Sequence, residues 1–254
     1  MKRNLLHRLT LLLPAAVLPA LMTHAGTPDL FGRLDSLVLD GHTIAVWDTT
    51  DTIPYLERGE RLTEKDYIEV AEELGVDVAA IKAVVEIEAG KSHRGFWSPG
   101  KPLINFDLSM YRQFAKRNNL NLATARKRSP VIFNRPNDRK YGSRQAAQQA
   151  RLDAAMAIDE RTAVQGTFWG MFQIGGFNWK KCGADSISQF VELMSRSERD
   201  QLELFVNFLR STGLDKHLRE HNWAAFARGY NGPSYASRGY HTRLASAYRR
   251  YSAQ

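Results

Sequence analysis

The sequence contains one cysteine, Cys182, among its 254 residues. One cysteine cannot form a disulfide within the chain, so the fold must depend on a packed core. Cys182 follows two lysines, which could lower the pKa of its thiol, but no histidine and aspartate stand out to complete a nucleophilic relay. We therefore expect Cys182 to be a small apolar side chain near a turn rather than a nucleophile.

Long apolar runs are also scarce, and the only one lies at residues 9–22. Three basic residues precede or open it, and small residues follow it at positions 23–25. This pattern predicts an export signal over residues 1–25 and a periplasmic or secreted protein. A retained anchor is the weaker alternative, because the run is short and contains two prolines. No later run could span a bilayer, so we expect no stable membrane insertion.

The charge balance is moderately basic, with a formal net charge of +8 that falls to +5 without the predicted signal. Such a charge favours an anionic cell wall, nucleic acid or lipid headgroups without choosing among them. The sequence has no arginine-rich tail and no interleaving of aromatic and basic residues, so we expect no nucleic-acid partner. His217 and His221 form a histidine pair of helical spacing but lack the zinc-protease pattern, and we predict no metal and no cofactor.

Two regions follow the predicted signal. Residues 26–62 form an extension in which residues 37–39 and 43–47 resemble short strands around the turn Asp40-Gly41. From Thr63 the pattern changes to successive helices. The first has a capping box and ends near Gly75, and the second is predicted over residues 78–89, capped by Asp77 and ended by Gly90. We expect a mainly α-helical domain over residues 63–254.

The remainder of this domain is less regular at first. Residues 91–143 predict a variable, loop-rich lobe with a possible strand at 103–106 and a possible helix at 110–118. Residues 145–164 predict one alanine-rich helix. Further helices are expected to start at Ser186 and Ser197, to end at Gly213, and to cover residues 223–228 and 241–251.

Glu88 lies on the apolar face of the second predicted helix. On a helical wheel it falls within an arc of roughly 120° that also holds Val84 and Val85. Burial raises the pKa of a carboxyl group and lets it hold a proton near neutral pH, as a general acid must. The alternative is that the helix frays after Val85 and leaves Glu88 at an exposed end. Glu86 points away from the arc, and we expect it to form a solvated ion pair with Lys82.

Three short motifs in the sequence resemble those of a known enzyme group. They are Glu88-Ala89-Gly90-Lys91, Gly170-Met171-Phe172-Gln173-Ile174 and Ala227-Arg228-Gly229-Tyr230-Asn231-Gly232. In this order they resemble the motifs of goose-type lysozymes and soluble lytic transglycosylases.

A closer resemblance covers residues 63–251. The runs 75–84, 169–178 and 223–233 are similar to those of the N-acetylmuramidase family of phage endolysins and bacterial cell-wall enzymes. This resemblance implies a lysozyme-like helical fold and hydrolysis of the β-1,4 bond between N-acetylmuramic acid and N-acetylglucosamine in peptidoglycan. It also implies Glu88 as the catalytic acid. We expect a monomer that acts on glycan strands without a cofactor.

The sequence departs from the family pattern at two places. Ala89 stands where the family usually has serine, and Phe106-Asp107-Leu108 stands where it has Phe-Glu with a nearby histidine. Asp107 is thus our candidate for the second catalytic carboxylate, as a base that positions water or as a stabiliser of an oxocarbenium ion. Its alternative role is to cap the following helix.

The substrate-binding candidates come from the second and third motifs. Gly170 would let a sugar approach the backbone, and Gln173 offers a donor and an acceptor to an N-acetyl group. Tyr230 could stack on a sugar or form a hydrogen bond near the acid, and Asn231 could support the turn. Phe172 is included in the same site, although a core position is the alternative for the aromatic residues of these motifs.

Three functions remain open from the sequence. The first is hydrolysis of the glycan, and the second is lytic transglycosylation, which uses the same acid and gives anhydro-sugar products. The third is a non-catalytic wall-binding module or a delivered antibacterial toxin. Whether cleavage inverts or retains configuration depends on the separation of the two carboxylates.

Overall fold

A computed structural model of the protein describes residues 61–90 and 93–254, together with the backbone of two short strands nearer the N-terminus. The chain divides into two compact units, residues 1–57 and 58–254. In the first unit, β1 (Ser36–Leu39) and β2 (His42–Ala45) pair antiparallel, which confirms the predicted strands around Asp40-Gly41. The predicted export signal and most of the predicted extension over residues 26–62 lie outside the described residues.

The second unit begins with two helices that have the predicted ends. α4 (Glu64–Leu74) starts at a capping box formed by Thr63 and Asp66, and Gly75 ends it in the left-handed conformation at φ 63°. α5 (Val78–Ala89) ends at Gly90. Both predicted spans are confirmed, because the capping box of α4, the stops at Gly75 and Gly90 and the apolar periodicity agree with the sequence.

The capping role predicted for Asp77 is wrong. Asp77 occupies the N-cap position of α5, but its side chain makes no capping hydrogen bond. The carboxylate instead accepts a hydrogen bond from Tyr248 and contacts Nε2 of His221, each at 2.7 Å. Both partners come from the end of the chain, so Asp77 joins the start of α5 to the C-terminal helices.

Two small sheets follow α5. β3 (Phe96–Ser98) and β4 (Lys101–Pro102) form an antiparallel hairpin. β5 (Ile104–Phe106), β6 (Thr167–Trp169) and β7 (Ile174–Gly175) form an antiparallel sheet in that order, with Ile104 opposite Trp169 and Trp169 opposite Ile174. The turn between β6 and β7 carries the second sequence motif.

Residues 93–143 are more regular than predicted. Besides the strands they contain α6 (Leu108–Arg117), α7 (Leu122–Arg128), the 3₁₀ turn η2 (Pro130–Ile132) and α8 (Asp138–Tyr141). Asp107, Asn121 and Asn137 each cap one of the three α-helices with a side-chain oxygen. The description of this lobe as loop-rich was wrong, because these polar residues start helices rather than loops.

The single helix predicted at 145–164 is two helices. α9 (Arg144–Met156) and α10 (Glu160–Gln165) are separated by a short break in which Asp159 caps α10 through a hydrogen bond from the backbone amide of Thr162. The remaining elements are η3 (Gly176–Asn178), α11 (Ile187–Arg196), α12 (Glu198–Thr212), α13 (Asp215–Arg219), α14 (Trp223–Asn231), η4 (Pro233–Tyr235) and α15 (Tyr240–Ser252). Ser186, Ser197 and Gly213 cap α11 and α12 as predicted.

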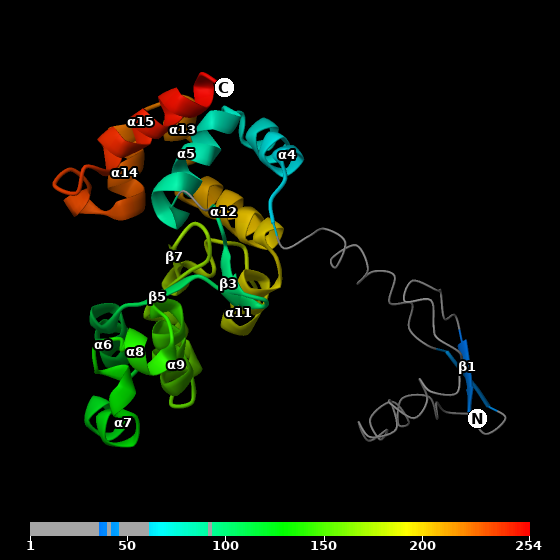
Figure 1. The fold of residues 1–254 in the computed structure, drawn as a ribbon, viewed down its shortest axis with the longest axis vertical. Helices are drawn as coiled ribbons and strands as arrows, with labels where there is room; N and C mark the ends of the chain where they lie inside the picture. The colour runs from blue at the N-terminus through cyan, green and yellow to red at the C-terminus, as the bar shows by residue number, and fades with distance from the viewer. Residues whose placement is uncertain (1–35, 40–41, 46–60, 91–92) are drawn as a thin grey trace. The chain divides into compact units, whose positions relative to one another are not determined.

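The helices lie in two groups about the β5–β6–β7 sheet (Figure 1). α6 to α9 gather on one side, while α5, α14 and α15 lie together on the other, where α15 packs along α5. The core includes Ile81, Val84 and Val85 of α5 and Phe205 of α12, all nearly fully buried. The mainly helical fold expected from the sequence is confirmed. No helix within the described residues is long and apolar enough to cross a membrane.

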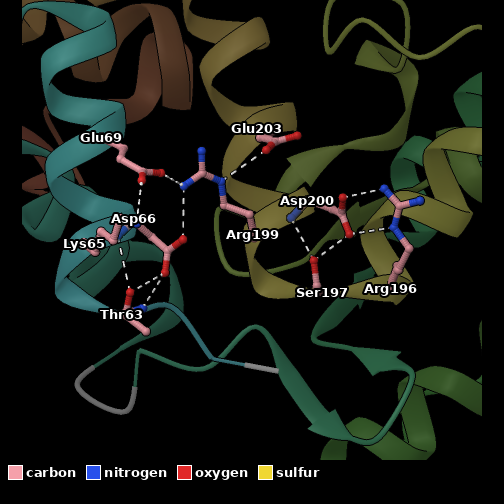
Figure 2. Close-up of polar contacts among 9 residues, drawn as sticks. All are labelled: Thr63, Lys65, Asp66, Glu69, Arg196, Ser197, Arg199, Asp200 and Glu203. Carbon is pink, nitrogen blue, oxygen red and sulfur yellow. Dashed lines mark hydrogen bonds and ion pairs between the residues drawn. The ribbon is translucent and has the colours of Figure 1, made fainter. Parts of the chain in front are cut away.

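A polar network joins the start of α12 to α4 (Figure 2). Arg199 of α12 contacts Asp66 at 3.0 Å, Glu69 at 2.7 Å and Glu203 at 3.1 Å. Beside it, Asp200 accepts hydrogen bonds from Arg196 and Ser197. These contacts fix the first turn of α12 against the start of the domain, since most of the charged groups in them are at least half-buried.

Candidate active site

Glu88 lies in the last turn of α5, on the same helix face as the buried Val84 and Val85. Its side chain is half-buried. Burial raises the pKa of its carboxyl group, and the hydrogen bond from Asn231 and the positive charge of Arg243 oppose this rise without cancelling it. Glu88 therefore holds its proton to a higher pH than an ordinary glutamate does.

Asn231 forms a direct hydrogen bond with Glu88. It ends α14, and its Nδ2 donates a hydrogen bond of 3.0 Å to Oε1 of Glu88. We expected Asn231 only to support a turn, whereas the structure joins the third motif to the first through this bond. Arg243, whose charge acts on the same carboxyl group, comes from α15.

Glu86 does not form the predicted pair with Lys82. Its carboxylate contacts the guanidinium of Arg250 and accepts a hydrogen bond of 2.9 Å from the Tyr251 hydroxyl. Lys82 pairs with Glu64 of α4 at 2.6 Å. The Glu86 side chain is only 15% exposed. The helical wheel pointed Glu86 away from the core, but α15 packs against that face and supplies other partners.

The turn from Gly170 to Gln173 has an unusual backbone. Gly170 has φ 70° and Gln173 has φ 47°, a left-handed value that is uncommon for a residue other than glycine. The backbone amide and Nε2 of Gln173 both donate to the carbonyl oxygen of Gly170, at 3.2 and 2.9 Å. Gln173 is half-buried, so its side chain reinforces the turn and leaves its own Oε1 as an acceptor.

Tyr230 links this turn to α14. Its hydroxyl donates a hydrogen bond of 2.5 Å to the backbone carbonyl of Phe172. Its ring stacks on Phe226 at 5.3 Å and meets the edges of Phe205 and Phe208. Burial raises the pKa of Tyr230 well above its ordinary value, and the nearby charge of Glu88 adds to this. Of the two roles considered, the packing favours the hydrogen bond near the acid over stacking on a sugar.

Phe172 itself belongs to the core. Its side chain is 1% exposed and stacks on Phe205 at 4.1 Å between ring centroids. The backbone carbonyl of Phe172, rather than its ring, is the group that meets the third motif. Cys182 is likewise fully buried, and burial raises the pKa of its thiol to about 12, so the thiol stays protonated and unreactive.

Asp107 occupies the N-cap of α6. Its Oδ1 accepts hydrogen bonds from the backbone amides of Ser109 at 2.7 Å and Met110 at 3.0 Å. Among the described residues it makes no hydrogen bond to Glu88, Gln173 or Asn231. The helix-capping role is therefore present, and Asp107 does not share the hydrogen bonds that bring the other site residues together.

Gln201 of α12 is a residue that the sequence analysis missed. It is fully buried, its Oε1 accepts from the backbone amide of Met171 at 2.7 Å, and its Nε2 donates to the carbonyl of Met194 at 2.8 Å. It thereby holds the turn after Gly170 in place. No local motif marks Gln201, but a glutamine on the buried face of an amphipathic helix is a signal of a paired polar group.

The first, second and third motifs thus meet through Glu88, Asn231, Tyr230 and the turn at Gly170–Gln173. A family model described as "Muramidase: N-acetylmuramidase" matches residues 77–252, which include all of these residues. The chain belongs to the N-acetylmuramidase family. Membership identifies it as a peptidoglycan hydrolase.

A solved structure supports this assignment. The chain is 38% identical to the Burkholderia AP3 phage endolysin, with a TM-score of 0.62, and the match covers 77% of this chain and 73% of the endolysin chain. A search of curated proteins finds no match.

Proposed function

We propose that this muramidase hydrolyses the β-1,4 bond between N-acetylmuramic acid and N-acetylglucosamine, with Glu88 as the general acid. The observation that carries the proposal is the state of Glu88 itself. Its carboxyl group has a raised pKa, and one of its oxygens is held by a side chain from the far end of the domain. A positioned carboxylic acid of this kind is what protonation of a leaving glycosidic oxygen requires.

The two oxygens of Glu88 take different roles in this mechanism. Oε1 accepts the hydrogen bond from Asn231, so Oε2 carries the proton and donates it to the glycosidic oxygen. Cleavage of the C–O bond then leaves positive charge at the anomeric carbon, and a water molecule adds there. The departing sugar keeps the proton from Glu88, and the water proton later restores the acid.

The other site residues hold the substrate against Glu88. Gly170 keeps the turn close against the buried Gln201, and Oε1 of Gln173 accepts a hydrogen bond from an N-acetyl or hydroxyl group of the sugar. Asp107 serves as the second carboxylate. Its Oδ1 is engaged by two backbone amides of α6, which leaves Oδ2 for the attacking water or for the developing cation.

Lytic transglycosylation is the second candidate. It needs the acid but no second carboxylate, because the muramic acid 6-hydroxyl displaces the bond. The engagement of Asp107 in capping α6 is the observation that favours it. Mass spectrometry of fragments released from purified peptidoglycan separates the two: reducing N-acetylmuramic acid ends support hydrolysis, and 1,6-anhydro ends overturn it.

We also propose that the protein is exported through residues 1–25, as the basic and apolar pattern of that segment indicates. Fractionation of cells that produce the full chain or a chain without residues 2–25 tests this. Loss of the extracytoplasmic protein on deletion supports the export signal, and unchanged export contradicts it.

A further inference from the structure

A cavity lies beside the β3–β4 hairpin, apart from the contacts that join Glu88 to Asn231. It has a volume of about 300 Å³ and is lined by Arg61, Arg94, Phe96, Trp97 and Glu198 among others. An adjoining hollow of about 410 Å³ shares the two arginines and two aromatic residues and adds Leu103. These volumes are within the range of small-molecule sites. We call the two together the arginine cavity.

Glu198 holds the backbone next to the two arginines of this cavity. Its side chain is buried, and its two oxygens accept hydrogen bonds from the backbone amides of Leu62 at 2.8 Å and Gly95 at 2.7 Å. These residues directly follow Arg61 and Arg94. One carboxylate thus fixes the two backbone segments that carry the guanidinium groups. Glu198 opens α12, whose first turn is braced by the network around Arg199 and Asp200 (Figure 2).

The cavity is rich in groups that bind anions. Arg61 and Arg94 are exposed and make no hydrogen bond or ion pair in the part of the chain that the structure describes. The ammonium of Lys101 lies 5.3 Å from the ring centroid of Trp97. Nε1 of Trp97 is buried and has no acceptor among the described residues. Guanidinium and indole N–H groups are donors only, so they suit a carboxylate.

The arginine cavity is connected to the turn of the active site. Leu103 lines the cavity, and its carbonyl oxygen accepts a hydrogen bond of 2.8 Å from the backbone amide of Gly170 in that turn. The amide of Leu103 in turn donates to the carbonyl of Gly95 at 2.7 Å. Gln201 bonds both the amide of Met171 and, at 3.4 Å, the same carbonyl of Gly95. The same set of hydrogen bonds therefore holds both the arginine cavity and the Gly170–Gln173 turn of the active site.

The chemistry of the polymer identifies the anion. In intact peptidoglycan the lactyl carboxyl group of muramic acid is bound in an amide to the peptide stem, so the glycan backbone is neutral and the free carboxylates belong to the peptides. We propose that the arginine cavity binds a carboxylate of a peptide stem while Glu88 acts on the glycan strand. This inference rests on the proposed function only in naming peptidoglycan as the polymer.

Binding of a free stem peptide tests the proposal without any cleavage. Protein labelled with ¹⁵N in the indole rings has five signals, one for each tryptophan, and Trp97→Phe identifies that of Trp97. A tetrapeptide stem with free carboxylates should shift this signal with saturation, whereas its fully amidated form should not. The double variant Arg61→Gln/Arg94→Gln should weaken the binding at least tenfold.

Arg112→Gln/Arg128→Gln is the matched control, because it removes two exposed arginines from α6 and α7, and it should bind the peptide as the natural chain does. The proposal is overturned if the peptide leaves the Trp97 signal unchanged or if the Arg61/Arg94 variant binds it equally well. It is also overturned if inorganic phosphate shifts the signal and the peptide does not, which would indicate a phosphate site.

A second measurement uses intact sacculi. The Arg61/Arg94 variant should raise KM severalfold, and by more than it lowers kcat, while the control variant keeps both. A fall in kcat alone contradicts a binding role. If the peptide binds but the natural chain releases no glycan fragments, the proposed function fails and the cavity assignment stands. If the natural chain cleaves the glycan but does not bind the peptide, the proposed function stands and the cavity assignment fails.

Discussion

Nδ2 of Asn231 donates a hydrogen bond of 3.0 Å to Oε1 of Glu88, from a position 143 residues further along the chain. This bond stabilises the ionised form of Glu88 and so opposes the rise of its pKa that burial causes. It also determines that Oε1, rather than Oε2, is the carboxyl oxygen that accepts this hydrogen bond. Asn231 thus both orients the Glu88 carboxyl group and stabilises its ionised form through one hydrogen bond.

Asn231→Ala should alter the pH dependence of cleavage. Removing the hydrogen bond raises the pKa of Glu88 further, so the alkaline limb of kcat/KM should move to higher pH. A hydrogen bond to a charged group contributes about 1.5–3 kcal/mol, so kcat should fall about tenfold or more. The measurement is a pH–rate profile of fragment release from peptidoglycan.

Asn222→Ala is the control for this variant, because Asn222 caps the other end of α14 through a hydrogen bond from the Ala225 amide. It should cost about 1 kcal/mol of stability and leave the pH profile in place. An Asn231→Ala profile that coincides with that of the natural chain would show that the bond does not influence the acid.

Glu88→Gln should stabilise the protein at neutral pH. The pKa of Glu88 is raised in the folded state above its ordinary value of 4.5, so the folded state binds this proton more tightly than the unfolded state does. Glu88 therefore contributes fully to the free energy of unfolding when the pH is below its ordinary pKa. This contribution is lost as the pH rises through the higher pKa of the folded state. Glutamine does not ionise and avoids the loss.

The Tm of Glu88→Gln minus that of the natural chain should therefore be near zero at pH 4 and should increase toward pH 8. Thermal unfolding across this range measures it. A difference that stays constant with pH contradicts the raised pKa.

Tyr230→Phe should lower both stability and activity. It deletes the hydroxyl that donates to the carbonyl of Phe172 and keeps the ring packed among Phe205, Phe208 and Phe226. Leaving a buried carbonyl without its donor costs about 1–3 kcal/mol. Urea unfolding and the rate of fragment release measure the two effects.

Tyr141→Phe serves as the comparison, because the Tyr141 hydroxyl makes no hydrogen bond with any described residue. This change should leave stability and rate within error. If Tyr230→Phe behaves in the same way, the hydroxyl does not hold the turn.

Gly170→Ala should be more costly than Gly213→Ala, although both glycines have nearly the same backbone conformation, with φ 70° and 69°. Alanine costs roughly 1–2 kcal/mol in this conformation. At Gly213 an added Cβ meets nothing within 4 Å, whereas at Gly170 it would lie 2.8 Å from Oε1 of the buried Gln201. The difference between the two free energies of unfolding isolates the contact, and equal losses would refute it.

The position of Glu88 could be predicted from the sequence because it depends on local features. The apolar spacing of Val84 and Val85 and the stop at Gly90 set the face and the end of α5. The same helical wheel failed for Glu86, because the wheel describes α5 alone and Arg250 comes from a helix 164 residues away. Local patterns carry no information about which helix covers a face.

The rest of the site could not be predicted for the same reason. The motifs named Asn231 and Tyr230 as members, but their partners depend on how α14 packs against α5 and the β6–β7 turn. Gln201 belongs to no motif and acts only through tertiary contacts. At the break between α9 and α10, the spacing of Asp159 and Thr162 was a local capping signal that the alanine-rich pattern around it concealed.

The most direct test of the account is the rate at which Glu88→Gln releases reducing N-acetylmuramic acid ends from purified peptidoglycan, compared with Glu72→Gln, the same change at an exposed glutamate of α4. General-acid catalysis contributes roughly 10²–10⁴-fold, so Glu88→Gln should lose at least 10²-fold while folding normally and Glu72→Gln should match the natural chain. A folded Glu88→Gln protein that keeps a rate within a fewfold of the natural chain would contradict the assignment of Glu88 as the catalytic acid.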